Sequence, residues 1–267
     1  MHHSPTSDHS FRFGGITRLY GESSLARLRA AHVCVVGLGG VGSWVVESLA
    51  RSGVGEISLI DADEVCVSNT NRQIHALAGS YGKSKAQALA ERVRAIAPEC
   101  RVHPIEAFFT AKNATELLSR NYSVLVDAID GVGNKSLLIA EAKKHNIPTV
   151  VCGGAGGRKD PTRIKLADLG RTEGDTLLNM VRRKLSREYG FPKYEGRKFH
   201  ISCVYSDEPQ VAPTPCEGAS ENAPVRLDCA TGYGAACHLT GAMGFFVAHA
   251  VIECITNGRL PTEPAPE

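Results

Sequence analysis

The sequence has few of the features that mark several common classes of protein. Its 267 residues carry a formal net charge of only +2, which favours no class of partner. None of its nine cysteines forms a CxxC pair, which argues against a zinc site built from neighbouring ligands. The cysteines follow no regular framework, and no charged n-region with an apolar h-region precedes the first predicted strand. These absences predict a cytoplasmic protein with free thiols.

Residues 33–42, VCVVGLGGVG, carry the strongest motif. An apolar run rich in β-branched residues ends in a glycine-rich turn, and a helical pattern follows at once. Backbone N–H groups at such a helix N-terminus can bind an anionic ligand. Asp61 follows a second predicted strand, at the spacing of a ribose-binding carboxylate. This half of the chain is therefore predicted to bind a nucleotide, and the glycines of the turn are Gly37, Gly39, Gly40 and Gly42.

Strand and helix patterns alternate as far as residue 157. The alternation predicts an α/β fold, with a Rossmann-like, doubly wound and mainly parallel sheet flanked by helices. Ligands bind beyond the carboxyl ends of the strands in such sheets. We expect residues 11–157 to form the nucleotide-binding core, with disordered tails over 1–10 and 256–267. The strands are predicted over 33–36, 56–60, 101–106, 123–127 and 149–152, with helices over 43–50, 82–97, 112–120 and 135–145.

Residues 158–255 are expected to be a C-terminal part of the same domain, with strands over 163–167 and 200–205. A basic helix is predicted over 176–189 and a long loop over 206–224. Between Arg182 and Lys198 the local charge excess is about +5, typical either of a solvated helix face or of a polyanion-binding patch. Its cations are Arg182, Arg183, Lys184, Arg187, Lys193, Arg197 and Lys198.

Residues 229–252 contain no charged side chain and predict an apolar helix. Small residues recur at every fourth position, which would let the helix approach another element closely. Length alone would permit a membrane span. The composition favours a helix that is buried or packed in a dimer over membrane association. The small residues are Gly232, Ala236, Thr240, Gly244 and Ala248.

Four motifs together resemble the ubiquitin-activating-enzyme-like (ThiF/MoeB) adenylation family. They are GLGGVGS at 37–43, DADEVCVSNTNRQ at 61–73, GKSKA at 82–86 and DAID at 127–130. The further segments RFGGITRLYG, SCVYSDE and DCATGYGAA are most similar to one branch, the dehydratases that act on threonylcarbamoyladenosine in tRNA. With them the resemblance extends over nearly the whole chain.

The resemblance implies an ATP- and Mg²⁺-dependent adenylation. Attack on the α-phosphorus builds negative charge on equatorial oxygens, where a cluster of cations is needed. By the family pattern the glycine loop holds the ATP phosphates, Asp61 the ribose hydroxyls and Asp130 the metal ion. Arg72, Lys85 and Asp130 are the expected catalytic residues. The remaining expected nucleotide ligands are Asp63, Asn69, Gln73 and Arg18.

Several of these assignments have alternatives. Asp61 and Asp130 could each serve only as a cap of a helix or loop. Lys83 is an alternative to Lys85 as the lysine that contacts the nucleotide, since both lie in the same turn. Arg18 or Arg12 could complete the site across a homodimer.

In the tRNA-modifying branch, the implied substrate is the carboxylate of threonylcarbamoyladenosine beside the anticodon. Its adenylation would be followed by ring closure, release of AMP and net loss of one water. No protein nucleophile is needed, because the attacking group is intramolecular. The basic segment 182–198 would then contact tRNA, and a sulfur-relay partner, either a cysteine desulfurase or a sulfur acceptor, is a further candidate.

Three other functions fit parts of the sequence. One is adenylation of the C-terminal Gly-Gly of a ubiquitin-like or sulfur-carrier protein, with transfer to a loop cysteine. Cys229 is the first candidate for that cysteine, followed by Cys203 and Cys216, although a structural role is favoured for each. A nicotinamide oxidoreductase would leave the cations Arg72 and Lys85, as well as Asp130, without roles. A non-catalytic nucleotide-binding module would not need them.

Overall fold

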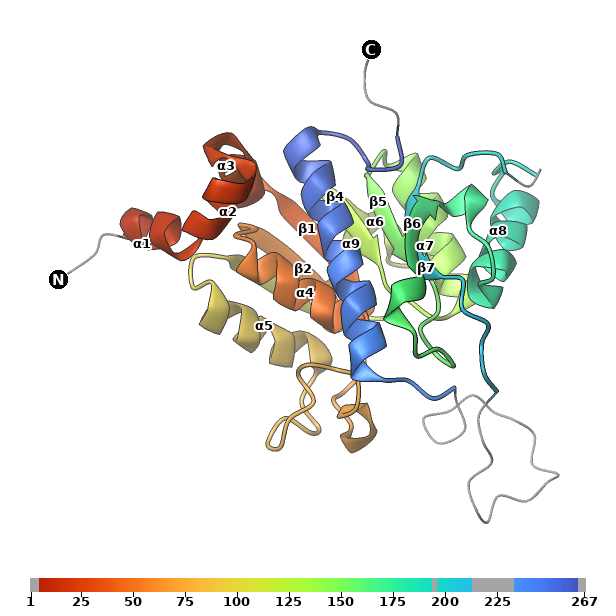
Figure 1. Cartoon of the computed structure of the whole chain (residues 1–267), viewed down its shortest axis with the longest axis horizontal. Coiled ribbons are helices and arrows are strands. Elements are labelled where there is room, and N and C mark those ends of the chain that lie inside the picture. Colours follow the sequence, from red (N-terminus) through yellow and green to blue (C-terminus); the bar gives the residue numbers. More distant parts are fainter. Residues whose placement is uncertain (1–4, 194–195, 213–232, 264–267) are drawn as a thin grey trace.

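One sheet of seven strands runs through the middle of the molecule, in the order β3-β2-β1-β4-β5-β7-β6 (Figure 1). In this computed structural model the described residues are 5–193, 196–212 and 233–263. Neighbouring strands are parallel except β6 and β7, which are antiparallel. The predicted doubly wound, mainly parallel sheet is confirmed. The strands are β1 (His32–Val36), β2 (Glu56–Ile60), β3 (Arg101–Ile105), β4 (Val124–Asp127), β5 (Thr149–Cys152), β6 (Ile164–Asp168) and β7 (Ser202–Ser206).

Helices cover both faces of the sheet (Figure 1). Alternate strand residues such as Val33 and Val35 point into one apolar layer, and Cys34 and Val36 into the other. Because both faces are buried, the inner strands read as nearly continuous apolar runs. The first layer contains α3 (Glu22–Ala30), α4 (Gly42–Arg51), α5 (Lys85–Ile96) and α9 (Cys237–Asn257). The second contains α6 (Ala114–Leu118), α7 (Val132–Lys144) and α8 (Thr176–Glu188).

Short elements complete the chain. Two helices, α1 (Pro5–Arg12) and α2 (Gly14–Tyr20), precede α3, and 3-10 turns lie at Val67–Asn69, Pro161–Arg163 and Leu169–Arg171.

Both predicted tails differ from the structure where it describes them. Residues 5–10 belong to α1, and α9 continues to Asn257. Beyond α9, Leu260 is 5% exposed within the apolar core. The hydroxyls of Thr262 and Ser202 lie 2.9 Å apart. The tertiary contacts of Leu260 and Thr262 therefore hold the segment after α9 against the core, although its composition predicts a disordered tail.

Helix α9 begins eight residues later than predicted and packs along α4. By length and composition it could cross a membrane, but 67% of its apolar window is buried inside the molecule. A Cβ on Gly244 would lie 2.6 Å from the Cβ of Trp44 and 2.9 Å from the carbonyl oxygen of Val41. Packing against α4 thus explains Gly244, while Thr240 lies against Gly40 of the glycine turn and Ala248 is fully buried.

Candidate nucleotide-binding site

The glycine turn joins β1 to α4 at the carboxyl edge of the sheet. Gly37 has φ of +88°, and a Cβ there would lie 2.7 Å from the carbonyl oxygen of Ala128. A Cβ on Gly42 would meet the Gly37 carbonyl oxygen at 1.9 Å. Neither position can accept a side chain without moving backbone. The turn therefore lies tightly against the segment that follows β4.

Asp61 is fixed to the glycine turn. Its carboxylate accepts the N–H of Leu38 at 2.6 Å and the N–H of Asp63 at 2.8 Å. The side chain is only partly exposed, directly after β2. A carboxylate held in this way at the mouth of the turn can accept further hydrogen bonds from hydroxyl groups. This is the placement expected of a ribose ligand.

The two lysines that are alternatives for the nucleotide contact, Lys83 and Lys85, have different surroundings in the structure. Lys85 begins α5, is 6% exposed, and its Nζ lies 2.8 Å from Oδ2 of Asp63. Lys83 is half exposed, and its Nζ lies 3.3 Å from Glu91 on the outer side of α5. Lys85 is therefore joined through Asp63 to the carboxylate at the glycine turn, whereas Lys83 belongs to the surface.

Arg72 and Gln73 lie against the other side of the turn. The Cδ of Arg72 is 3.6 Å from where a Cβ on Gly40 would stand, and Nε2 of Gln73 is 4.0 Å from that position on Gly39. The Arg72 guanidinium donates to the Ser68 carbonyl oxygen and to Asn71, and it pairs with no carboxylate among the described residues. Its positive charge is thus available to a ligand.

Asn69 and Trp44 shape the segment that carries Arg72. Asn69 is 3% exposed, and its Oδ1 accepts the N–H of Cys66 at 3.0 Å. Nε1 of Trp44 donates to the Arg72 carbonyl oxygen at 3.0 Å. Asn69 therefore holds the local turn, and its contact with a triphosphate stays a prediction.

The two aspartates after β4 have different surroundings. Asp127 is fully buried, and its carboxylate lies 3.1 Å from Nζ of Lys135, which is also fully buried. Burial raises the pKa of Asp127, and the Lys135 ammonium opposes that rise. Asp130 is exposed at the carboxyl edge of the sheet, with no hydrogen bond or ion pair to another described residue. Its carboxylate is the one that remains available to a cation.

His75 is a site neighbour that the sequence reasoning missed. It is 2% exposed, and neither ring nitrogen has a hydrogen-bond partner among the described residues. Burial lowers the pKa of His75 to about 4, and the positive charges of Lys85 and Arg92 contribute to that shift. Its position in the NRQIHAL segment beside Arg72 was the signal available in the sequence.

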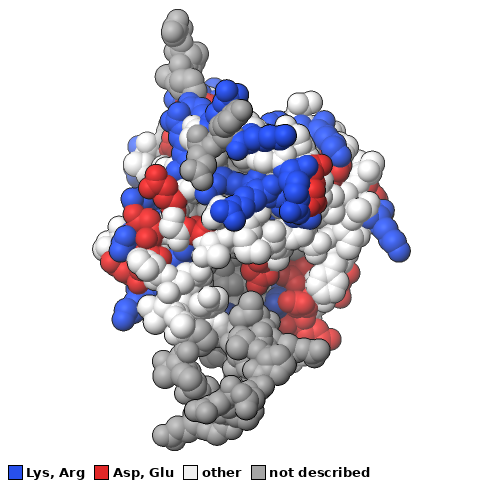
Figure 2. Space-filling model, turned by 90° about the vertical axis from the view of Figure 1, so that its right-hand side faces the viewer, with Lys and Arg blue, Asp and Glu red and all other residues white. Residues whose placement is uncertain are grey.

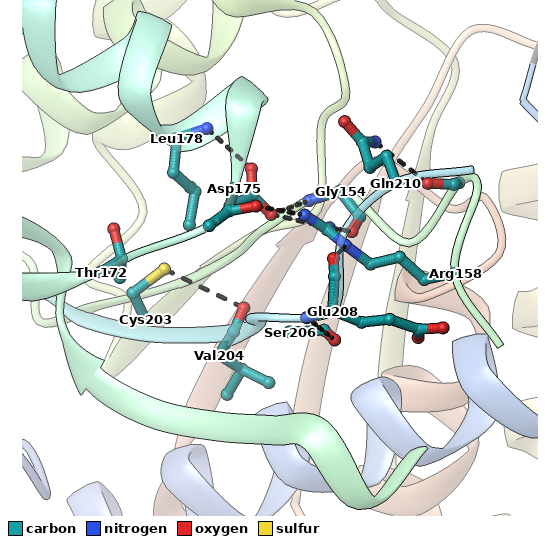
Figure 3. Close-up of polar contacts among 12 residues, drawn as sticks. Gly154, Arg158, Thr172, Asp175, Leu178, Cys203, Val204, Ser206, Glu208 and Gln210 are labelled. Atoms are coloured by element: carbon teal, nitrogen blue, oxygen red, sulfur yellow. Dashed lines mark hydrogen bonds and ion pairs between the residues drawn. The ribbon is translucent and has the colours of Figure 1, made fainter. Parts of the chain in front are cut away.

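A second buried ion pair, also missed, lies beside the turn after β5 (Figure 3). Nη1 of Arg158 is 2.9 Å from Oδ2 of Asp175, and both side chains are buried. Arg158 also donates from Nε to the Glu208 carbonyl oxygen at 2.8 Å and from Nη2 to the Gly174 carbonyl oxygen at 3.0 Å. Arg158 thus ties the turn after β5 to the segment after β7.

That turn also holds the chain on either side of residues 213–232. The Gly157 N–H donates to the carbonyl oxygen of Gly234 at 2.8 Å, and the Val211 N–H donates to that of Gly157 at 2.7 Å. Nδ2 of Asn71 donates to the Ala235 carbonyl oxygen at 2.8 Å. The segment that leads into α9 is therefore attached next to Arg72.

Two other predicted site residues lie elsewhere. Arg18 is exposed on α2, which precedes α3, and α3 contacts the far end of α9 through Arg27 and Thr256. Arg18 is therefore distant from the glycine turn of its own chain. Cys203 is 0% exposed in β7, and burial raises its pKa well above the usual value, which does not fit a nucleophile. Cys216 and Cys229 lie outside the described residues.

A tight glycine turn, an anchored carboxylate and two neighbouring cations, Arg72 and Lys85, at the carboxyl edge of a parallel sheet define a nucleotide-binding α/β protein. The sequence matches the ThiF family over residues 15–263. The chain belongs to the ThiF family.

Relatives and solved structures narrow the resemblance. The chain is 50% identical over 242 residues to a tRNA threonylcarbamoyladenosine dehydratase of Haemophilus influenzae, covering 91% of this chain and 92% of that one. It is 48% identical over 246 residues to the Escherichia coli protein of the same name, covering 90% and 92%. The crystal structure of E. coli TcdA in complex with ATP matches with a TM-score of 0.85 at 42% identity, over 97% and 98% of the two chains.

The match to a carrier-activating relative is shorter. A sulfur carrier protein adenylyltransferase of Thermus thermophilus is 36% identical over 118 residues, 44% of this chain and 43% of that protein. The comparisons therefore favour the tRNA-modifying branch over the carrier-activating one.

Proposed function

We propose that this protein is an ATP-dependent tRNA threonylcarbamoyladenosine dehydratase. The observation that carries the proposal is the high identity, over nine-tenths of both chains, to proteins of that name. The site geometry supports it, because the glycine turn, Asp61, Arg72, Lys85 and Asp130 gather at one edge of the sheet. A solved relative of the same fold binds ATP in its crystal structure, and another crystal of it holds AMP.

The reaction needs a carboxylate to be activated and then displaced. The threonyl carboxylate of the modified base attacks the α-phosphorus of ATP, and pyrophosphate leaves. A nucleophilic atom of the carbamoyl group in the same side group of the base then attacks the activated carbonyl carbon, and AMP leaves with the former carboxylate oxygen. The base has lost one water and gained a ring. Because the second nucleophile is already tethered to its target, the protein has only to orient the group and exclude water.

The residues of the site fit these steps. Asp61 would accept the ribose hydroxyls, and the backbone N–H groups of the glycine turn would face the phosphates. The guanidinium of Arg72 offers a planar fork to phosphate oxygens, whereas Lys85 offers a compact point charge. Both would stabilise the negative charge that grows at the α-phosphorus.

Asp130 fits the Mg²⁺ that the family implies. Hard carboxylate oxygens are the ligands that Mg²⁺ prefers, and Asp130 presents one without a competing partner among the described residues. Asp127, by contrast, is fully buried, and its Oδ1 is occupied by Lys135 and by the N–H of Ile129. When bound there, Mg²⁺ would neutralise charge on the departing pyrophosphate.

Two variants test the site. Arg72→Ala and Asp130→Asn should each lose tRNA-dependent AMP formation by about 100-fold or more, because the first removes a cation that would stabilise the developing negative charge and the second weakens the carboxylate that would hold Mg²⁺. Lys83→Met, which alters a surface lysine in the neighbouring turn, should retain activity. Thermal unfolding should show that all three fold. Normal AMP formation in both site variants would refute the assignment.

The basic side of the molecule is the proposed tRNA surface. Figure 2 faces the side on which α8 lies, where lysine and arginine side chains gather in a band across its upper half. Arg183, on α8, and Lys193, which follows α8, are both exposed and have no acidic partner among the described residues. Arg182 has a structural role instead, because it donates to the Thr172 carbonyl oxygen at 2.8 Å. Cations that face solvent in this way bind phosphates by releasing counterions.

Salt dependence tests this surface. The double variant Arg183→Gln with Lys193→Gln should weaken tRNA binding and reduce the slope of log K against log salt by about 2, because each cation that neutralises one phosphate adds roughly one to that slope. The matched control is Arg29→Gln with Arg94→Gln, which removes two exposed cations from α3 and α5. An unchanged slope in the first variant would show that this face is only solvated.

Assembly and location are part of the same proposal. Arg18 is distant from the nucleotide site of its own chain. If it contacts a nucleotide, it would do so in a homodimer, at the site of the other subunit. We place the protein in the cytoplasm, with tRNA and ATP, and not on a membrane, because α9 is mostly buried against α4. A sulfur-relay partner remains a secondary proposal.

A further inference from the structure

A cluster of two imidazoles and one carboxylate lies at the amino edge of the sheet, opposite the nucleotide site. His32 begins β1 and pairs in register with Glu56, which begins β2. One ligand atom from each of His32, Glu56 and His103 lies within 4.8 Å of the other two. None of these three residues has a role in the nucleotide site. Because β1 has five residues, the cluster is about 16 Å from the glycine turn.

The two ring nitrogens of His32 face different oxygen atoms. Its Nε2 lies 2.9 Å from Oγ of Ser58, which can accept the ring proton, and its Nδ1 lies 3.7 Å from Oε1 of Glu56. The ring also packs edge-on against Tyr122, with centroids 4.7 Å apart. Burial lowers the pKa of His32, which favours the neutral imidazole. Metal-binding histidines characteristically donate their second ring N–H to a neighbouring oxygen in this way.

Glu56 presents one oxygen to both imidazoles. Nε2 of His103 lies 2.8 Å from Oε1, and Nε of Arg101 lies 3.2 Å from Oε2. Arg101 therefore fixes the carboxylate by one oxygen and leaves the other directed at the two histidines. The hydrogen bond from Arg101 lowers the pKa of Glu56, so the group is ionised at neutral pH.

The cluster is accessible from one side. The side chain of His103 is 38% exposed, whereas those of His32 and Glu56 are 12% and 19% exposed. Tetrahedral ligation at about 2.0–2.1 Å separates donor atoms by roughly 3.3 Å. Nε2 of His103, on the open side, would withdraw from Oε1 of Glu56 by about 0.5 Å to reach that separation.

We propose that His32 Nδ1, Glu56 Oε1 and His103 Nε2 form a binding site for a divalent transition metal, with Zn²⁺ as the ion of best fit. Two imidazoles and one carboxylate suit this borderline ion, while Mg²⁺ prefers a set of oxygens. Water would complete a four-coordinate sphere. The ion would clamp β1, β2 and β3 together at the end remote from catalysis, so its effect would be on stability and not on AMP formation.

Calorimetric titration with ZnCl₂ tests the proposal. Chelator-treated protein should bind one Zn²⁺, and Glu56→Gln and His103→Asn should each weaken binding by about 10-fold or more. The matched control is His145→Asn, which alters an exposed histidine after α7 and should leave binding unchanged. Equal affinity in the native protein and in both cluster variants would overturn the assignment.

Two further measurements distinguish metal binding at this cluster from metal binding elsewhere in the protein. The visible spectrum of the Co²⁺-loaded protein should show d–d bands without thiolate charge transfer; a strong thiolate band would move the ion to the cysteines and refute the site. Zn²⁺ should raise the midpoint of thermal unfolding of the native protein and of His145→Asn, but not that of Glu56→Gln. A rise of equal size in Glu56→Gln would contradict the proposal even if that variant were less stable.

Discussion

Two glycines on α9 offer a matched test of how the apolar helix is held. A Cβ on Gly244 would lie 2.6 Å from the Cβ of Trp44 and 2.9 Å from the Val41 carbonyl oxygen. A Cβ on Gly241 would lie 3.6 Å from the Trp44 ring, an ordinary contact. Both substitutions to alanine gain about 0.8–1.0 kcal/mol of helix propensity. Only Gly244→Ala adds the cost of overpacking, about 1–3 kcal/mol.

The difference between the two variants isolates the contact with α4. We expect Gly241→Ala to be as stable as the native protein or more so, and Gly244→Ala to be less stable than Gly241→Ala by about 1–3 kcal/mol in urea unfolding. Because Val41 directly precedes α4, Gly244→Ala should also weaken ATP binding. Equal stability of the two variants would show that α9 does not pack on α4 at this distance.

Three further predictions concern charged groups of the interior. Lys85→Met should lower AMP formation by about 100-fold while Lys83→Met keeps it within about twofold, measured as AMP release with modified tRNA; equal losses would contradict the separation of the two lysines. Unfolded His75 binds a proton below about pH 6.5, whereas the folded protein binds it only near pH 4, so stability should fall as the pH drops through this range. His75→Gln should flatten that dependence in urea unfolding, and an unchanged curve would show that another group causes it. Lys135→Met should cost about 3–5 kcal/mol of unfolding free energy because Asp127 is left buried and unpaired, and adding Asp127→Leu should recover most of it; no recovery would mean that packing and not charge is responsible.

Local patterns were sufficient for the sheet and for the motifs at its carboxyl edge. Continuous apolar runs such as residues 33–36 identify strands buried on both faces, and Pro98 or the glycine turn limits the neighbouring helices. The predicted boundaries of strands and helices before residue 229 differ from those observed by no more than three residues. Asp61 and Asp130 could be placed near the glycine turn because parallel strands bring their carboxyl ends to one edge.

The start of α9 could not be found in this way. Its apolar pattern begins at residue 229, but Gly234 and Ala235 accept hydrogen bonds from Gly157 and Asn71. Ala236 is extended, and the helix begins at Cys237. Partners that are distant in sequence decide this boundary, so no local pattern records it.

The buried ion pairs escaped prediction for the same reason. Arg158 and Asp175 are 17 residues apart, and nothing in either segment distinguishes them from surface residues. The cluster of His32, Glu56 and His103 depends on three strands coming into register, which sets His32 beside Glu56. Likewise, only the tertiary structure shows that Arg18 is far from the nucleotide site and that Cys203 is in the core.

Dehydration of a modified base changes the mass of a nucleoside, so mass analysis of nucleosides can detect the proposed reaction itself. Transfer RNA bearing threonylcarbamoyladenosine would be incubated with the protein, ATP and Mg²⁺, and then digested. The modified nucleoside should lose the mass of one water, only when ATP is present, with one AMP formed for each base converted. An unchanged nucleoside, together with AMP formation that instead requires a carrier protein ending in Gly-Gly, would contradict it.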